Sequence, residues 1–340
     1  MKHPLVAPLL VAVLAAAGSC GGDDSAEDPA VEVIIDEPAS ATPGPNVLDA
    51  QATPLQSPAG PLRTPAVVSL DWLAGNAAVP ELPPFAPAHL DQPLIDAVRA
   101  ALTGAPGHSS VVVHNLRDGR FAAVNETDVY YAASLFKMGI MLEAYRQRDA
   151  AKLDFAKLLT LEEKYVQYDL GTLDELELEA GDMLTVADAV KAMTVLSDTP
   201  TAVLLQDTVG CSTADQTLVS LGITDTKFCN RALPATAADM ATLIEAVASG
   251  AGVSNASRLE MLSLMSQEQY RQGVIAGVPA GTVVAHKSGS YTNATHDVSL
   301  VWGPAGPYVI VVLTDQQLNW AAIANVSLAV WSHFSAYPGP

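Results

Sequence analysis

Strand-like segments stand at both ends of the globular part of this chain, and helix-like segments occupy the middle. Residues 109–125, "SSVVVHNLRDGRFAAVN", predict two strands joined by a turn at 117–120. Strand patterns return at 281–291, 296–303 and 308–314. Because a sheet must bury an apolar face against another layer, we expect one antiparallel sheet built from both ends of the domain. The expected fold class is α/β in the broad sense (α+β), with flanking helices and an inserted all-helical lobe.

Helical periodicity accounts for the rest of the globular part. "LDQPLIDAVRAAL" opens it at 90–102, and "NWAAIANVSLAVWSHF" closes it at 319–334. Residues 150–275 have a mostly helical pattern between the two groups of strands. A cleft between a sheet layer and a helical lobe is a common ligand site, so a site is expected at that boundary.

The charge balance excludes several kinds of partner. The 340 residues include 17 Lys and Arg against 37 Asp and Glu, which gives a formal net charge of -20. This balance argues against nucleic-acid binding and against electrostatic docking on anionic lipid. Hydrophobic residues make up 49% of the chain, which is enough for a sizeable core.

The first residues predict export. Residues 1–20, "MKHPLVAPLLVAVLAAAGSC", have a basic start, an apolar run and small residues before Cys20. The run is too short for a comfortable membrane span. The pattern resembles the signal of bacterial lipoproteins, in which the cysteine becomes the lipidated N-terminus, although Ala17 stands where leucine is usual. An ordinary secretory signal with an incidental cysteine is the alternative.

Residues 21–86 are rich in Pro, Ala, Gly and acidic residues. Such a composition buries too little apolar surface to offset the loss of chain entropy. We therefore expect a disordered tether between a lipid anchor and a folded domain at 87–340. The protein would contact the membrane only through this lipid, on the periplasmic or extracellular side of a cell envelope.

Two cysteines, Cys211 and Cys229, lie in the predicted domain. Export permits a disulfide, and a single pair is what a disulfide requires. Two buried free thiols are the alternative. The spacing of Cys and His residues matches no zinc motif, and the sequence has no glycine-rich phosphate loop, so neither a metal nor a cofactor is expected.

A lysine inside an apolar helix is the first chemical signal. In residues 130–145, "YYAASLFKMGIMLEAY", apolar residues surround Lys137 on all sides of the predicted helix, which indicates burial. A buried ammonium loses hydration, and its pKa falls. Residues three apart share a helix face, so a neutral Lys137 amine can take the proton of the Ser134 hydroxyl. Ser134 also stands at the predicted helix start, where free N–H groups favour developing negative charge.

Two further motifs follow in a fixed order. Ser197 begins "SDT" after a helical segment, and Lys287 begins "KSG" on a predicted strand. Together with "SLFK" at 134–137 they give the order SxxK, SD[NT] and K[ST]G, which resembles class A β-lactamases and penicillin-binding proteins. The resemblance extends from about residue 88 to the C-terminus.

This resemblance implies a role for each motif residue. Ser134 resembles the acylated nucleophile, and Lys137 resembles its proton acceptor. Ser197 resembles the hydroxyl that relays protons between the lysine and the leaving nitrogen. Lys287 resembles the cation that holds this relay and attracts the substrate carboxylate. Since Lys287 would lie near Lys137, it would also disfavour a second positive charge there.

The resemblance also implies contacts around the scissile bond. Ser288 would offer its hydroxyl to the substrate carboxylate, and Gly289 would let the strand backbone approach the ligand. The backbone N–H groups of Ser134 and Ser290 would form the oxyanion hole.

Two expected substrate contacts depart from the family pattern. Thr199 stands where the family usually has asparagine, so it would meet the substrate without a carboxamide donor, which alters substrate choice. His296 lies near the position where several relatives carry a carboxylate-binding arginine. It would bind a carboxylate only when protonated, and a polar residue at a strand end is the alternative.

The pattern breaks at 224–240, "TDTKFCNRALPATAADM". Class A β-lactamases carry a longer loop there, with a glutamate that activates the deacylating water. Residues 227–238 contain no carboxylate, and the replacements considered (Asp198, Asp297 and Glu163) lack the family's position. Loss of a positioned general base costs about two to four powers of ten in rate, so slow β-lactam turnover is expected.

The expected function is that of a cell-envelope serine hydrolase that forms an acyl-enzyme on Ser134. Its partners would be small β-lactam or peptidoglycan-peptide-like substrates, and nucleic acid is excluded. A D-Ala-D-Ala-type peptidase or esterase is one alternative. A non-catalytic lipoprotein that binds peptidoglycan or a β-lactam is another, although retention of all four motif side chains argues against it.

Overall fold

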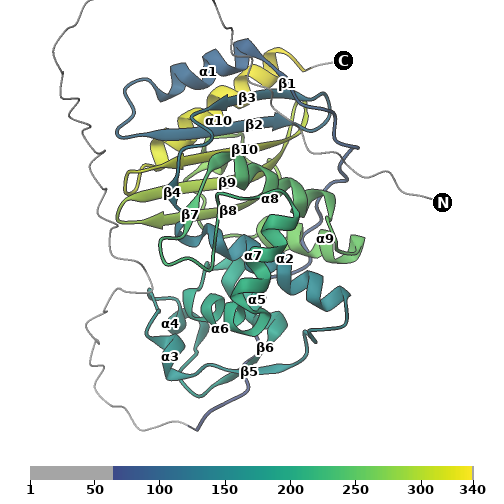
Figure 1. The fold of residues 1–340 in the computed structure, drawn as a ribbon, viewed down its shortest axis with the longest axis vertical. Helices are drawn as coiled ribbons and strands as arrows, with labels where there is room; N and C mark the ends of the chain where they lie inside the picture. Colours follow the sequence, from purple (N-terminus) through teal and green to yellow (C-terminus); the bar gives the residue numbers. More distant parts are fainter. Residues whose placement is uncertain (1–63, 339–340) are drawn as a thin grey trace, which may run out of the picture. The chain divides into compact units, whose positions relative to one another are not determined.

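The computed structural model describes residues 64–338, and within them the two groups of strands form one six-stranded sheet. Its strand order is β1-β3-β2-β10-β9-β8, so strands from the beginning and the end of the domain lie side by side (Figure 1). All neighbours are antiparallel except the short β1, which runs parallel to β3. The strands are β1 (His89–Leu90), β2 (Ser109–Asn115), β3 (Arg120–Val124), β8 (Val284–Tyr291), β9 (Ala294–Gly303) and β10 (Gly306–Thr314). The predicted sheet is confirmed.

Both faces of the sheet are covered, and the side chains of β2 alternate between them. Val111 packs with Leu94 and other apolar side chains of α1 (Gln92–Leu102) and α10 (Trp320–Ala336). The next residue, Val112, belongs to the larger core shared with the lobe. Figure 1 shows α1 and α10 together beside the sheet, with the lobe on its other side. This two-sided burial explains the unbroken apolar runs at 111–113 of β2 and 308–313 of β10.

The lobe is formed by the chain between β3 and β8. It contains two short strand pairs that were not predicted: β4 (Tyr130–Tyr131) with β7 (Pro234–Ala235), and β5 (Leu158–Thr160) with β6 (Met183–Thr185). Its helices are α2 (Phe136–Asp149), α3 (Glu163–Val166), α4 (Leu173–Leu176), α5 (Val186–Val195), α6 (Thr199–Val209), α7 (Cys211–Ser220), α8 (Ala237–Ser249) and α9 (Asn255–Met265). The same stretch of chain contains two short 3-10 turns, η1 (Ala133–Leu135) in the lobe and η2 (Val274–Gly277), which packs against α10.

Local sequence signals fix where helices begin. The Asp91 carboxylate accepts a hydrogen bond from the Leu94 N–H at 3.0 Å at the start of α1. Asp198 does the same for the Thr201 N–H at 2.7 Å at the start of α6. Each carboxylate satisfies a donor that the first turn leaves free. The second of these caps also fixes the loop that carries Ser197.

Residues 64–86 are part of the fold, so the prediction of a tether that reaches residue 86 is wrong for this segment. The Val68 N–H donates to the Met183 carbonyl at 2.8 Å, which places the segment beside β6. Leu70 is fully buried in the core of the lobe. The average composition of 21–86 concealed this, because a few well-spaced apolar side chains suffice to anchor a Pro-rich segment.

The predictions for the signal at 1–20, the lipidation of Cys20 and the tether up to residue 63 lie outside the described residues. Within residues 64–338, no helix is long and apolar enough to cross a membrane.

The predicted disulfide is confirmed. Cys211 and Cys229 are bonded, with Cα atoms 5.4 Å apart. Cys211 is the first residue of α7, and Cys229 lies in the loop between α7 and β7, residues 221–233. The bond therefore joins this loop to the lobe.

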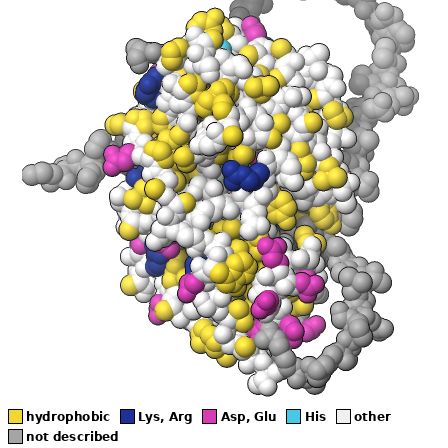
Figure 2. Space-filling model, turned by 180° about the vertical axis from the view of Figure 1, so that it is seen from behind, with side chains coloured by type: hydrophobic (Ala, Val, Ile, Leu, Met, Phe, Trp, Pro, Cys, Tyr) yellow, Lys and Arg dark blue, Asp and Glu magenta, His cyan; other side chains and the backbone are white. Residues whose placement is uncertain are grey.

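Acidic side chains are concentrated on one part of the surface. Figure 2 shows them gathered over the lower part of one face, where the lobe lies. Two short helices of the lobe, α3 and α4, carry exposed Glu163, Asp174 and Glu175.

Candidate active site

Ser134 lies at the centre of η1, directly before α2. Its neighbours Ala133 and Leu135 are buried, whereas Ser134 is partly exposed. Ala133 has a φ of 47°, a left-handed conformation that is unfavourable for a residue with a Cβ. The preceding Ala132 N–H donates to the Leu233 carbonyl at 2.8 Å. The loop at 221–233 thus helps to hold the backbone that presents Ser134.

Lys137 converges with the motif hydroxyls as the sequence predicts. Its Nζ lies 3.1 Å from Ser134 Oγ, 3.2 Å from Ser197 Oγ and 3.2 Å from Thr199 Oγ1. It also donates to the Ser197 backbone carbonyl. Only 1% of Lys137 is exposed, so its contacts are made within the protein rather than with bulk water.

The environment favours the neutral form of Lys137. Burial lowers its pKa to about 7 from an ordinary value of 10.5, and the positive charge of Lys287 adds to the effect. The negative charges of Asp198 and Glu268 oppose the shift without cancelling it. Near neutral pH a large fraction of the side chain is therefore a free amine, which can accept a proton from a hydroxyl.

Ser197 sits in the short connection between α5 and α6. Its φ of 56° places it in the left-handed region, which is unfavourable for serine. The cap formed by Asp198, which also accepts a hydrogen bond from the Thr172 hydroxyl, fixes this connection. The strained turn directs the Ser197 hydroxyl toward Lys137.

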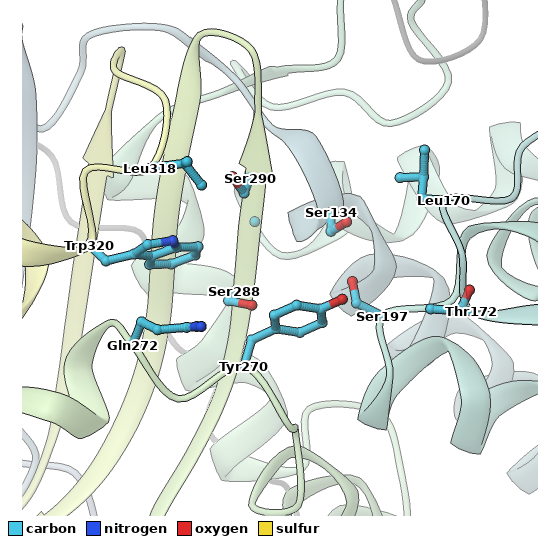
Figure 3. Close-up of a pocket in the computed structure, with 11 residues that line it drawn as sticks. Ser134, Leu170, Thr172, Ser197, Tyr270, Gln272, Ser288, Ser290, Leu318 and Trp320 are labelled. Carbon is cyan, nitrogen blue, oxygen red and sulfur yellow. The ribbon is translucent and has the colours of Figure 1, made fainter. Parts of the chain in front are cut away.

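These groups face a cavity of about 250 Å³ between the lobe and the sheet. Figure 3 shows Ser134 and Ser197 on one side of it and Ser288 and Ser290 of β8 on another. The lining residues are Ser134, Leu170, Thr172, Ser197, Tyr270, Gln272, Ser288, Gly289, Ser290, Leu318 and Trp320. The expected position of the site at the boundary between sheet and lobe is therefore correct.

Gly289 brings β8 close to the nucleophile. A Cβ at this position would lie 3.2 Å from the Ala132 carbonyl oxygen and 3.3 Å from the Ser134 backbone nitrogen. The absence of a side chain therefore lets the strand backbone pack against η1. The neighbouring Ser290 lines the cavity, which is consistent with an oxyanion hole formed by its N–H and that of Ser134.

Lys287 and Ser288 have a partner that the sequence did not predict. Lys287 Nζ forms an ion pair with Glu268. The Ser288 hydroxyl donates to Glu268 Oε1 at 2.8 Å, and the Ser288 N–H donates to Oε2 at 2.9 Å. Lys287 also donates to the Ser288 carbonyl at 3.0 Å. The predicted contact of Lys287 with the Ser197 relay is thus replaced by an ion pair, because Glu268 offers a full negative charge.

A second buried carboxylate lies behind this pair. His286 Nδ1 is 3.4 Å from Glu268 Oε2 and 3.2 Å from Asp297 Oδ1, and all three side chains are fully buried. Burial by itself lowers the pKa of His286, but the two carboxylates outweigh it and the pKa is raised. A protonated His286 would balance the second carboxylate as Lys287 balances the first.

Thr199 and His296 were expected to contact the substrate, but neither of them lines the cavity. Thr199 is 4% exposed and directs its hydroxyl to Lys137, so it supports the base. His296 is fully buried in β9, with Nε2 2.8 Å from the Tyr131 carbonyl and Nδ1 accepting from the Thr314 N–H at 3.2 Å. Burial lowers the pKa of His296 to about 4. The side chain is therefore neutral near pH 7, and the prediction that it binds a carboxylate is wrong.

The cavity has no obvious carboxylate base. Among residues 64–338, no Asp or Glu lines it. Asp198 is held by Thr201 and Thr172, and Asp297 accepts from the Val274 N–H at 2.8 Å. Glu163 is exposed on α3 and lies outside the lining. None of the three replacements considered from sequence is in place. In the same part of the chain, no group of three or more His, Cys, Asp or Glu residues is arranged to hold a metal.

Glu268 and most of the residues that line the cavity opposite Ser134 were not predicted from the sequence. Glu268 lies 19 residues before Lys287, in a stretch with no motif of its own. Leu318 and Trp320 come just after β10, and their position after a predicted central strand was the one usable signal. Tyr270 and Gln272 come from the irregular connection after α9, whose course cannot be read from periodicity.

Comparison with known proteins agrees with this geometry. A family model described as "Beta-lactamase enzyme family" matches residues 93–334. The structure of PBP-A is similar, with a TM-score of 0.70 and 21% identity over 74% of this chain and 100% of the other. A β-lactamase from Sphaerobacter thermophilus DSM 20745 has a TM-score of 0.64 and 25% identity, over 73% of this chain and 99% of the other. An ancestral (GNCA) class A β-lactamase has a TM-score of 0.64 and 25% identity, over 71% of this chain and 100% of the other. A search of curated proteins finds no match.

Proposed function

Because the chain belongs to the β-lactamase enzyme family, we propose that it is a serine acyl-hydrolase that forms an acyl-enzyme on Ser134 with β-lactams or related amides and esters. One observation carries this proposal. The Lys137 amine lies 3.1 Å from the Ser134 hydroxyl, and its pKa is lowered to about 7. A buried lysine held against a hydroxyl in this way is suited to proton abstraction.

Acylation proceeds through groups that are already in contact. Lys137 takes the proton of Ser134 as Oγ attacks the carbonyl carbon, and the backbone N–H groups of Ser134 and Ser290 stabilise the oxyanion. When the intermediate collapses, the carbon–nitrogen bond breaks and Ser197 donates its proton to the leaving nitrogen. The Lys137 ammonium, 3.2 Å from Ser197 Oγ, returns a proton to that hydroxyl. The lysine ends neutral and Ser134 carries the acyl group.

Deacylation is the slow step in this proposal. The acyl group must be hydrolysed by a water molecule, and no carboxylate among the described residues lines the cavity to activate it. A positioned general base contributes about two to four powers of ten in rate. A penicilloyl ester on Ser134 should therefore persist. A variant of PBP-A, 22% identical to this chain, is described as an acyl-enzyme complex with penicillin G, so the fold accommodates such an adduct.

Intact-protein mass spectrometry tests the proposal. A fluorophosphonate and penicillin G should each add one adduct, absent in Ser134→Ala, and the penicillin adduct should remain after the free compound is removed. Lys137→Met keeps an unbranched side chain without the amine and should slow labelling by about two to four powers of ten. Rapid hydrolysis without an adduct would contradict slow turnover. No labelling by either probe would overturn the acyl-enzyme itself.

A peptidase or esterase is the second candidate. The cavity lining carries no formal charge to select a carboxylate, which favours simple esters over both typical β-lactams and D-Ala-D-Ala peptides, because each of the latter carries a carboxylate. Hydrolysis of nitrocefin compared with that of D-Ala-D-Ala peptides and of simple esters separates the two activities.

We also propose that the protein is exported and lipid-anchored through Cys20. The lipoprotein-like signal at 1–20 supports this. Metabolic labelling with palmitate should mark the full-length protein and not Cys20→Ala, and equal labelling of both would contradict the anchor.

A further inference from the structure

We propose that Glu268 is a specificity-determining residue that fills the anion-binding position of the site with a carboxylate of the protein itself. The cavity then selects uncharged acyl donors, namely neutral esters and amides with an apolar or aromatic group, over substrates that carry a carboxylate. This inference rests on the proposed function, because it names the substrate class of the Ser134 acylation.

The first support is the convergence of donors on Glu268. The Lys287 ammonium, the Ser288 hydroxyl and the Ser288 N–H all donate to its two carboxylate oxygens. The Lys287 ammonium and the Ser288 hydroxyl are the groups that the sequence assigned to the substrate carboxylate. In the structure both already donate to Glu268, a buried carboxylate that does not line the cavity.

Because the ion pair is buried, a substrate carboxylate cannot easily replace Glu268 as the partner of Lys287. Glu268 is fully buried, and Lys287 is 1% exposed. A substrate carboxylate that captured Lys287 would take from Glu268 the cation that donates to it directly, and would leave only His286, at 3.4 Å, as a positively charged neighbour in the interior. Removal of one partner from a buried ion pair is strongly unfavourable, so the external anion gains little from this lysine.

The lining of the cavity also favours uncharged substrates. Its side chains are hydroxyl, amide, aliphatic and aromatic groups, and among the described residues none is charged. Leu318 and Trp320 form an apolar wall on the side of β10, while Leu170 belongs to the lobe (Figure 3). His296, the other expected anion ligand, is buried and neutral.

The rim adds negative charge. Tyr270 lines the cavity. Burial is the main cause that raises the pKa of its hydroxyl, and the nearby negative charges of Glu268 and Glu175 raise it further. Glu175 is exposed on α4, next to the exposed Asp174. An anionic ligand therefore approaches a rim whose nearby charge repels it.

Arg271 is the rival source of positive charge. It is exposed, and its neighbours Tyr270 and Gln272 both line the cavity, although Arg271 itself does not. If Arg271 bound the substrate carboxylate, the cavity would still favour anions. The test must separate its contribution from that of Lys287.

The experiment compares two substrates that differ only in this charge. Benzylpenicillin and its methyl ester are reacted with the full domain, and the second-order rate constants of Ser134 acylation are measured by mass spectrometry. We expect the ester to react at least as fast as the acid. In Glu268→Gln, the acid-to-ester ratio should rise about ten- to hundredfold, the range expected for one hydrogen bond to a charged group. Glu163→Gln, an exposed control on α3, should leave the ratio unchanged.

Three outcomes overturn the inference while the proposed function stands. In the first, the wild-type protein acylates with the acid a hundredfold faster than with the ester. In the second, Glu268→Gln is folded by circular dichroism and its ratio does not change. In the third, Arg271→Ala lowers the acid rate tenfold. If Glu268→Gln does not fold, the wild-type ratio and Arg271→Ala still decide the question. Failure of the proposed function looks different, because then neither penicillin nor a fluorophosphonate labels Ser134.

Discussion

Two buried lysines serve opposite purposes in this site. Lys137 is surrounded by hydroxyls and a carbonyl, and burial lowers its pKa to about 7. Lys287 is equally buried but is paired with the Glu268 carboxylate. Neutral partners leave the first lysine available as a base, whereas the ion pair ties up the second. The choice of partner, more than the choice of residue, decides what each lysine can do.

Gly289→Ala tests how closely the strand must approach the nucleophile. The added Cβ would lie 3.2 to 3.4 Å from atoms of Ala132, Ser134 and Ala133, so η1 must shift by a few tenths of an ångström. A displacement of about 1 Å costs on the order of 10²-fold in rate, and we expect about tenfold slower labelling by a fluorophosphonate. Gly75→Ala is the control, because its Cβ would meet no atom within 4 Å. Equal labelling of both variants would show that the contact is not needed.

The residues that spacing alone predicts are those joined by local sequence, whereas the long-range partner Ser197 was predicted from the family resemblance. Ser134 and Lys137 share one helical turn, and the sequence alone places their side chains together. Glu268 reaches Lys287 from a connection without regular periodicity, and His296 gave no sign of which way it would face. Long-range partners of this kind depend on how elements pack, which residue types do not reveal.

At the scale of elements, the loop at 221–233 packs directly on α2, the helix that bears Lys137. Phe228 of this loop is buried against α2 at Gly139, where a Cβ would lie 2.5 Å from its ring. The Leu233 carbonyl then accepts the Ala132 N–H beside the nucleophile. The loop therefore supports η1 from behind, even though it supplies no carboxylate to the cavity.

Removal of the disulfide should weaken this support. The bond between Cys211 and Cys229 closes a segment of 18 residues, for which chain entropy predicts about 3 kcal/mol of stabilisation. The double variant Cys211→Ser/Cys229→Ser should lose about that much unfolding free energy in a denaturant titration. Reduction of the wild-type protein should give the same loss, and a change below about 0.5 kcal/mol would show that the loop is held by packing alone.

At the scale of the whole molecule, the fold class and the sheet built from both ends followed from hydrophobic periodicity. The start of the folded part did not, since a Pro-rich segment has no period. Residues 64–86 nonetheless pair with β6 and bury Leu70, and the side chain of Lys191 on α5 reaches Asp71 at 2.9 Å. The folded unit is therefore longer than its sequence pattern indicates.

Leu70→Ala measures the contribution of this segment. Truncation of a fully buried leucine costs about 2–5 kcal/mol of unfolding free energy, so we expect a loss in that range. Val67→Ala in the same segment is the control, because Val67 is 60% exposed and should change stability by no more than about 0.5 kcal/mol. If the two variants unfold alike, the segment is not part of the cooperative fold.

The proposed chemistry depends most on the protonation state of Lys137. Protein labelled with ¹³C at lysine Cε can be titrated by NMR, with the Lys137 signal assigned by its loss in Lys137→Met. We predict a midpoint at about pH 7, with the ammonium below it and the amine above it, so that Ser134 acylation rises through the same range. A midpoint near the ordinary value of 10.5 would leave Lys137 charged at neutral pH and would contradict its role as the base.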